Sequence, residues 1–280
     1  MKTLLLLLLP ALVTATYIPA VKFIDDNDTA YGVTQINGKV RTSSKPYTYD
    51  IAEGRLDGHG VVFVYGYNGS VGTTQEAVIP TSTTQNYMAA AAKIAVTCDS
   101  TRDSTGNAGA RTVVVTGLDS LYAVQAETLT LDGVTGPKST KYWLRPLLVR
   151  VLTAGTAGSN LGNVYVKDST STTTYLQASA GRGQSHHAIW TVPDGYQLHV
   201  VGFFGSDASS KGARISLYYR PYGGAWTNPA GTAIFDAFAT LPLACPFTIP
   251  AKADIQFRAT AVLAGAIVTA GLEGWYDAHE

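Results

Sequence analysis

Charge is scarce in this sequence, and it carries no net sign. Only 14% of the 280 residues are charged, and 20 basic residues balance 20 acidic ones, whereas about 25% is usual. A nucleic-acid-binding domain presents a basic field, and an anionic membrane attracts polybasic segments. The balance therefore argues against both partners, and we expect no nucleic acid and no membrane.

Long hydrophobic runs are missing as well. The strongest run, Leu4–Leu9 with its neighbours, is too short to span a bilayer, which takes about 20 residues. A polytopic membrane protein is therefore excluded. The hydrophobic share of 46% also excludes a disordered chain, which combines low hydrophobicity with high net charge.

Residues that usually cover helix surfaces are few, with 5 Glu and 10 Lys. The chain has instead 34 Thr, 17 Ser, 28 Gly and 16 Tyr. Thr and Tyr favour strands, and Gly favours turns. Strand signals recur every 8 to 14 residues without a strand–helix–strand pattern. The sequence therefore predicts an all-β protein of the β-sandwich or jelly-roll-like class.

The predicted organisation has three parts. Residues 1–57 form an apolar leader and an extended N-terminal arm, and residues 58–135 form a smaller antiparallel β unit. Residues 136–280 form a jelly-roll-like β-sandwich. The boundary between the last two lies at 133–140, where two glycines and a proline interrupt the apolar pattern.

Two segments of the C-terminal part, Arg214–Arg220 and Asp254–Ala261, alternate cleanly between apolar and polar residues. A period of two is typical of a half-buried strand. It places four side chains in the core: Ile215, Leu217, Ile255 and Phe257. Val61–Tyr67 is a continuous apolar run and indicates a buried strand.

Metal and nucleophile chemistry has little support. His186 and His187 are adjacent, so on a strand they face opposite sides, and no further His lies three to five residues away. Ser185 beside His186 lacks the geometry of a catalytic pair, and no G-x-S-x-G elbow occurs. The run Asp25–Asp28 lacks the ligand spacing of a calcium loop. We expect no catalytic, cofactor-binding or metal-binding residues and no cofactor.

Cys98 and Cys245 are the only cysteines, and their separation excludes a CxxC metal site. They would pair in an exported protein and stay reduced in the cytosol. Cys98 lies on the apolar face of its predicted strand, which favours a role as a small buried hydrophobe.

Four aromatic residues are predicted to be exposed: Tyr218, Tyr222, Trp226 and Trp275. Exposed rings of this kind stack on sugars, or they form a subunit interface, where Tyr and Trp are enriched. The sequence does not separate these two uses.

The first sixteen residues have two interpretations. Lys2, the leucine run and a small-residue site at 13–15 fit a cleaved secretory signal peptide, and Asn27 and Asn68 would then lie in glycosylation sequons. The alternative is a retained apolar arm that docks onto a neighbouring subunit. We favour the arm, because Leu4–Leu9 lies outside the β pattern and water does not tolerate it exposed.

Distinctive motifs are distributed between residues 49 and 280. They are YDIAEG (49–54), GHG (58–60), YGYN (65–68), VGTTQE (71–76), GARTV (109–113), GLD (117–119), ETLTLDG (127–133), TVPDGY (191–196), YRPYGG (219–224), IPAKADI (249–255) and RATA (258–261). Together they resemble a recurring pattern in virion structural proteins of tailed phages, many of them marine. The leucine run is not a feature of that pattern.

The resemblance implies a β-rich component present in many copies on the particle, with no catalytic residues to carry over. We therefore expect a non-enzymatic structural protein of the virion, on the exterior of the head, as a decoration or as the base of a head spike or fibre. Expected partners are other virion proteins, namely the major capsid protein or a fibre or spike protein. We also expect a homo-oligomer, a trimer or a ring.

Three alternatives stay open at this stage. One is a tail or neck protein of the virion that contacts a receptor. Another is a secreted glycan-binding β-sandwich, which requires cleavage after Ala15. The third, a β-sandwich hydrolase, is disfavoured because neither paired carboxylates nor a catalytic triad are present in the sequence pattern.

Overall fold

The computed structural model describes residues 47–80, 83–234 and 237–278, together with four short strands nearer the N-terminus. The chain divides into two compact units, Met1–Tyr47 and Thr48–Glu280. In the first, β1 (Lys22–Ile24) pairs with β2 (Ala30–Gly32), and β3 (Gln35–Ile36) pairs with β4 (Lys39–Val40), both antiparallel. The leucine run, the site at 13–15 and the run Asp25–Asp28 lie outside the described residues.

The only α-helix among the described residues is α1 (Tyr47–Ala52). It ends in a Schellman motif, in which the Gly54 N–H donates to the Ile51 carbonyl and the Arg55 N–H donates to the Asp50 carbonyl. Gly54 has a φ of +67°, which costs a glycine little. No helix in the described part of the chain is long and apolar enough to cross a membrane.

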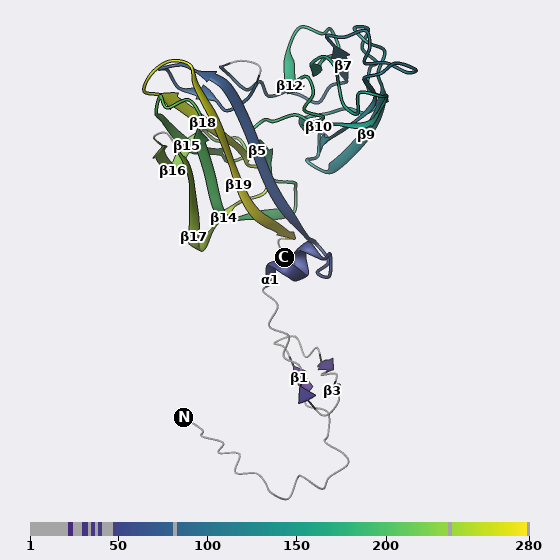
Figure 1. The fold of residues 1–280 in the computed structure, drawn as a ribbon. Helices are drawn as coiled ribbons and strands as arrows, with labels where there is room; N and C mark the ends of the chain where they lie inside the picture. The colour runs from purple at the N-terminus through teal and green to yellow at the C-terminus, as the bar shows by residue number, and fades with distance from the viewer. Residues whose placement is uncertain are drawn as a thin grey trace, which may run out of the picture. The chain divides into compact units, whose positions relative to one another are not determined.

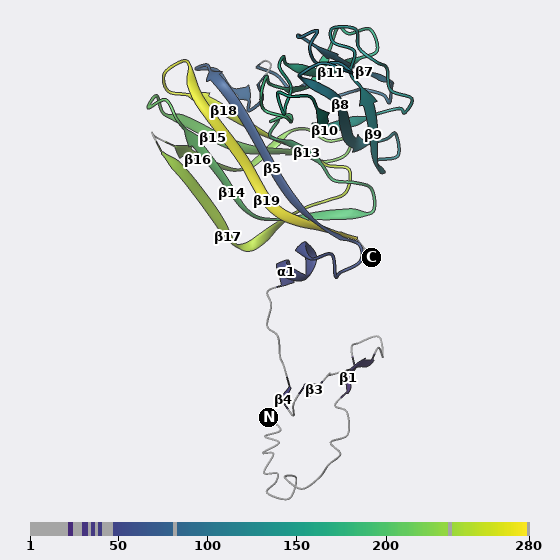
Figure 2. The same ribbon diagram turned by 45° about the vertical axis from the view of Figure 1, so that its right-hand side comes forward.

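The prediction of an all-β sandwich is confirmed. One layer has the strand order β17-β14-β19-β5, and the other has β13-β18-β15-β16, with β6 also paired to β18 (Figures 1 and 2). Their bounds are β5 His59–Val71, β6 Glu76–Ala77, β13 Ile189–Thr191, β14 Tyr196–Asp207, β15 Ala213–Arg220, β16 Thr227–Ile234, β17 Phe238–Ile249, β18 Asp254–Ala261 and β19 Ala266–Ala278.

The core of this sandwich lies between the two layers. The four side chains that alternation placed in the core are at most 3% exposed, which confirms that prediction: Ile215, Leu217, Ile255 and Phe257. They come from β15 and β18, which pair along their whole length.

A second hydrophobic core is built from two three-stranded sheets, β10-β8-β9 and β12-β11-β7. Trp143, fully buried, is its largest side chain. The strand bounds are β7 Ile94–Cys98, β8 Ala110–Leu118, β9 Val124–Thr130, β10 Arg145–Ala154, β11 Val164–Asp168 and β12 Thr174–Ala178. This smaller part is thus inserted between β6 and β13 of the sandwich.

The strands are divided between the two cores differently from the expected parts 58–135 and 136–280. β5 lies beside β19 (Figure 1), and its inward residues Val62 and Val64 join the sandwich core. β10, β11 and β12 instead pack with β7, β8 and β9. The physical reason is that strand pairing depends on matching apolar faces, and β5 finds its match about two hundred residues later.

Candidate functional site

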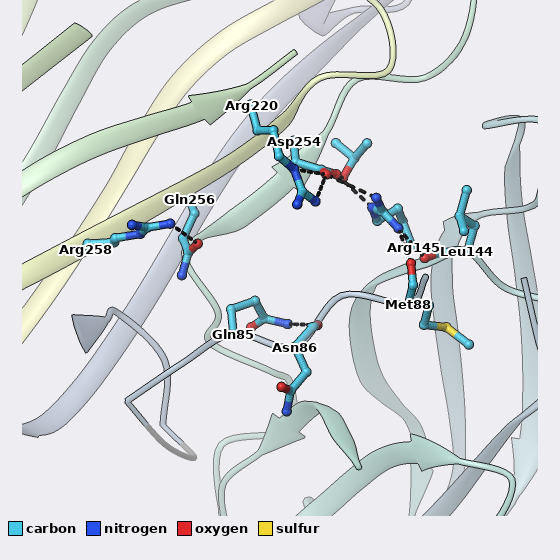
Figure 3. Close-up of polar contacts among 10 residues, drawn as sticks. Gln85, Asn86, Met88, Leu144, Arg145, Arg220, Asp254, Gln256 and Arg258 are labelled. Atoms are coloured by element: carbon cyan, nitrogen blue, oxygen red, sulfur yellow. Dashed lines mark hydrogen bonds and ion pairs between the residues drawn. The ribbon is translucent and has the colours of Figure 1, made fainter. Parts of the chain in front are cut away.

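A buried carboxylate, Asp254, lies where the two cores meet (Figure 3). It opens β18 and is 3% exposed. The neighbouring strands place Arg220 and Thr191 directly opposite it in register. Arg145 reaches it from the first position of β10, in the other core.

The carboxylate of Asp254 accepts hydrogen bonds from three side chains. Arg145 binds both oxygens, with Nε 2.8 Å from Oδ1 and Nη2 3.1 Å from Oδ2. The Thr191 hydroxyl donates to Oδ1 at 2.7 Å. Arg220 donates to Oδ2 through Nε at 3.2 Å and also through Nη2. This arrangement, the ion cluster of Asp254, Arg145, Arg220 and Thr191, satisfies a buried charge by pairing and hydrogen bonding.

The cluster is charged at neutral pH. Burial by itself raises the pKa of the Asp254 carboxyl, but hydrogen bonds and charge from Arg145, with hydrogen bonds from Arg220 and Thr191, outweigh burial and hold that pKa below its usual value. Arg145 is 8% exposed, and its Nη1 donates to the carbonyls of Met88 and Leu144 at 2.9 Å each. The ion cluster is therefore a fixed joint between the two cores.

Aromatic rings surround the guanidinium groups near this joint. The Tyr87 ring centroid lies 5.4 Å from the guanidinium carbon of Arg145 and 5.1 Å from that of Arg220. Trp226 lies 4.8 Å from Arg220 and 5.0 Å from a third arginine, Arg258. Distances of this order are typical of cation–π contacts.

An apolar surface covers the outer side of the layer β17-β14-β19-β5. Phe63 and Phe204 stack with ring centroids 5.5 Å apart, and Phe204 lies 6.3 Å from both Tyr65 and Phe238. Phe63 and Phe238 are each 65% exposed. We call Phe63, Tyr65, Phe204 and Phe238 the apolar face.

Two hollows meet on the apolar face. One of about 440 Å³ includes all four of its residues together with Glu273. A second of about 500 Å³ shares Phe63 and Tyr65 and continues to Leu118 and Val124 of the smaller part. A continuous exposed apolar surface of this kind marks an interaction site in a soluble protein.

The sequence does not predict the apolar face, because the continuous apolar run Val61–Tyr67 is typical of a strand buried on both sides. In the structure this run alternates: Val62 and Val64 are buried, whereas Val61 is 57% exposed and Phe63 65%. The only sign of the apolar face in the sequence is that this run places large apolar residues on both sides of one strand.

The expectation that Tyr218, Tyr222, Trp226 and Trp275 are exposed is corrected by the structure, because only Tyr222 is exposed. Tyr222 is 68% exposed and lies edge-on to Tyr122. Tyr218, Trp226 and Trp275 are half-buried. Tyr218 and Trp226 contact Arg258, and Trp275 stacks on His199.

The residues considered for chemistry have structural partners. The Ser185 hydroxyl, 4% exposed as a residue, accepts from the Val149 N–H at 3.1 Å, and the His186 ring lies edge-on to Tyr65. His187 is 5% exposed, with Nδ1 2.8 Å from Gln85 Oε1 and Nε2 accepting from the Gln177 N–H at 2.9 Å. The described residues contain no group of three His, Cys, Asp or Glu placed to hold a metal ion.

The two cysteines are free and do not pair. Cys98 is 4% exposed within the second core, which confirms its predicted burial, and Cys245 is exposed. Burial, with the nearby Asp103 and Asp99, raises the pKa of the Cys98 thiol to about 12. Cys98 is therefore a protonated, inert side chain at neutral pH.

No protein-family model matches the sequence, and no curated protein matches it. Among solved structures, the chain is similar at 10% identity to infectious bursal disease virus, Gt strain, with 83% of this chain and 77% of that chain covered and a TM-score of 0.20. The VP2 subviral particle of that virus matches at 10% identity, with 84% and 86% covered and a TM-score of 0.17.

A bacterial enzyme matches to the same degree. The isomalto-dextranase of Arthrobacter globiformis T6, complexed with panose, has 10% identity and a TM-score of 0.20. The match covers 79% of this chain and 35% of the enzyme. At such identities and TM-scores, neither the fold nor the role of these proteins transfers to this chain.

Proposed function

We propose that this protein is a non-enzymatic structural component of a tailed-phage virion, on the exterior of the head, as a decoration or as the base of a head spike or fibre. The motifs between residues 49 and 280 support this role through their resemblance to virion structural proteins. A rigid all-β body with two cores is also suited to permanent packing in a particle.

The observation that carries the proposal is the apolar face. Phe63 and Phe238, both 65% exposed, lie on a rigid sheet and would be covered in an assembled particle. We assign a second copy of this chain as the occupant, because a chain with no net charge does not repel its own copies over long range.

The structure of the β17 edge of this sheet also favours association through the apolar face. β17 is one of the two edge strands, and it contains Pro242 and Pro246. Proline has no N–H to donate and interrupts pairing with an added strand. Four residues of β17, Leu243–Pro246, also bulge opposite Val201. Copies are therefore expected to meet through side chains of the apolar face rather than by adding a strand at β17.

The test has two arms. In purified phage particles, mass spectrometry should find this chain, and antibody labelling should place it on the head. For the isolated protein, sedimentation velocity should show an oligomer that the double variant Phe63→Ser, Phe238→Ser converts to monomer. Leu263→Ser is the matched control, because Leu263 is equally exposed, at 62%, in the turn between β18 and β19.

Absence of the chain from purified particles would refute the virion role. A monomeric wild-type protein, or a double variant that stays oligomeric with an unchanged circular dichroism spectrum, would refute the assignment of the apolar face.

A further inference from the structure

A small polar pocket lies beside the ion cluster and has no part in the proposed assembly. Its volume is about 200 Å³, and its walls include Arg258, Gln75, Gln85, Gln256, Tyr87 and Trp226. Arg258 and Gln256 come from β18, and Gln85 lies on the segment between β6 and β7 (Figure 3).

Arg258 supplies an unpaired positive charge to this pocket. Its guanidinium is held between the rings of Tyr218, at 4.4 Å, and Trp226, at 5.0 Å. Its polar contacts are with the neutral Gln75 Oε1 at 3.4 Å and Gln256 Oε1 at 3.5 Å, both long for hydrogen bonds. Within residues 47–80, 83–234 and 237–278, no carboxylate forms an ion pair with it.

The neighbouring carboxylates are already occupied. Asp254 accepts from Arg145, Arg220 and Thr191. Glu76 accepts from the Gly72 N–H at 3.0 Å and from Asn68 Nδ2 at 3.4 Å. Of the three arginines near Tyr87 and Trp226, Arg145 and Arg220 pair with Asp254. The positive charge of the third, Arg258, is therefore not neutralised by a neighbouring carboxylate.

The pocket also offers neutral hydrogen-bonding groups. Gln75 and Gln256 line it with side-chain amides, whereas the Gln85 amide is already bonded to Asn86, Tyr175 and His187. The Tyr87 ring adds an aromatic wall, while its hydroxyl is buried away from the open space. A planar guanidinium that stacks on aromatic rings and is flanked by side-chain amides is suited to recognise an oxyanion.

We propose that this pocket binds an oxyanion, a carboxylate or a phosphate group, with Arg258 as its principal ligand. The volume suits one anionic group and its immediate substituent rather than a nucleotide. The inference does not depend on the virion role, because binding is a property of the isolated chain.

Isothermal titration calorimetry of the full chain at low ionic strength tests the proposal with two probes, sodium glucuronate and inorganic phosphate. We expect saturable binding of at least one probe, weakened by added salt because the contact is between charges. Preference for glucuronate would indicate a carboxylate ligand, and preference for phosphate a phosphorylated one.

Three variants make the test specific. Arg258→Gln should weaken binding at least tenfold, whereas Arg214→Gln, on the exposed side of the adjacent strand β15, should leave it unchanged. Gln75→Glu is nearly isosteric at an exposed position and places a carboxylate against Arg258, so it should also abolish binding while the fold is retained. Failure of the wild-type chain to bind either probe, or wild-type affinity in a folded Gln75→Glu variant, would overturn the proposal.

Discussion

At the scale of single residues, His187 illustrates how burial fixes a protonation state. Its Nδ1–H donates to Gln85 Oε1, and its Nε2 accepts the Gln177 N–H. A second proton would bring an N–H against the Gln177 N–H. Burial, with the nearby His186, lowers the pKa of the His187 imidazole to about 3.

This depressed pKa predicts how stability depends on pH. The unfolded chain binds a proton at His187 below pH of about 6.5, whereas the folded chain stays neutral there until pH of about 3. The free energy of unfolding should therefore fall as pH falls below about 6.5, with a slope approaching about 1.4 kcal/mol per pH unit. Urea unfolding between about pH 5 and pH 7 measures it, before most carboxyls titrate.

The variant His187→Gln removes this proton uptake and should reduce the slope. His186, whose pKa burial also lowers, contributes with the same sign, so a smaller slope should remain. Leu263→Ser, which changes no titrating group at a position that is 62% exposed, is the control and should leave the slope unchanged. An unaltered slope in His187→Gln would contradict this assignment.

At the scale of elements, Gly271 allows the rings of the apolar face to pack directly against the backbone of β19. It sits opposite Tyr65 of β5 and Phe204 of β14. A Cβ at this position would lie 2.0 Å from the Val64 carbonyl oxygen and 2.4 Å from the Phe204 ring. Glycine is therefore required by close approach rather than by an unusual φ.

Gly271→Ala should accordingly destabilise the protein by at least about 1–3 kcal/mol, as overpacked substitutions do. Because the Phe204 ring must move, oligomer formation should weaken as well. Urea unfolding and sedimentation velocity give the two measurements. Gly224→Ala, at an exposed turn position, is the control, and equal stability of the two variants would contradict the steric argument.

Sequence patterns located elements well where the local period was strong. β15 and β18 followed from clean alternation, and their four inward side chains are buried. The pairing of β5 with β19 did not follow, because nothing local marks a partner so distant in sequence. The ion cluster was missed for the same reason: Arg145 and Asp254 are 109 positions apart, and the motif IPAKADI, which contains Asp254, gives no sign of a buried ion pair.

At the scale of the whole molecule, the ion cluster joins two hydrophobic cores that share few other charged contacts. Calorimetry of the wild-type chain should therefore show one unfolding transition for residues 48–280. Arg145→Met removes the bidentate partner of Asp254 and should cost about 3–5 kcal/mol. It should also separate the transition into two, as each core then unfolds at its own temperature.

Lys252→Met is the matched control for that measurement. Lys252 pairs with Asp194 at 2.9 Å on the surface, with side chains 31% and 50% exposed, and such pairs contribute at most about 1 kcal/mol. A wild-type chain that already unfolds in two steps, or an Arg145→Met variant that unfolds in one, would show that the cluster does not couple the cores.

The insertion of the smaller part between β6 and β13 has a consequence for synthesis on the ribosome. β5 ends at Val71 and its partner β19 begins at Ala266, so at about 5–20 residues per second β5 waits on the order of ten to forty seconds for that partner. The strands of the insertion need only local contacts and emerge during this interval. The nascent chain must therefore keep Phe63 and its neighbours from aggregating until β19 has emerged, and we expect a chaperone to bind β5 during that interval.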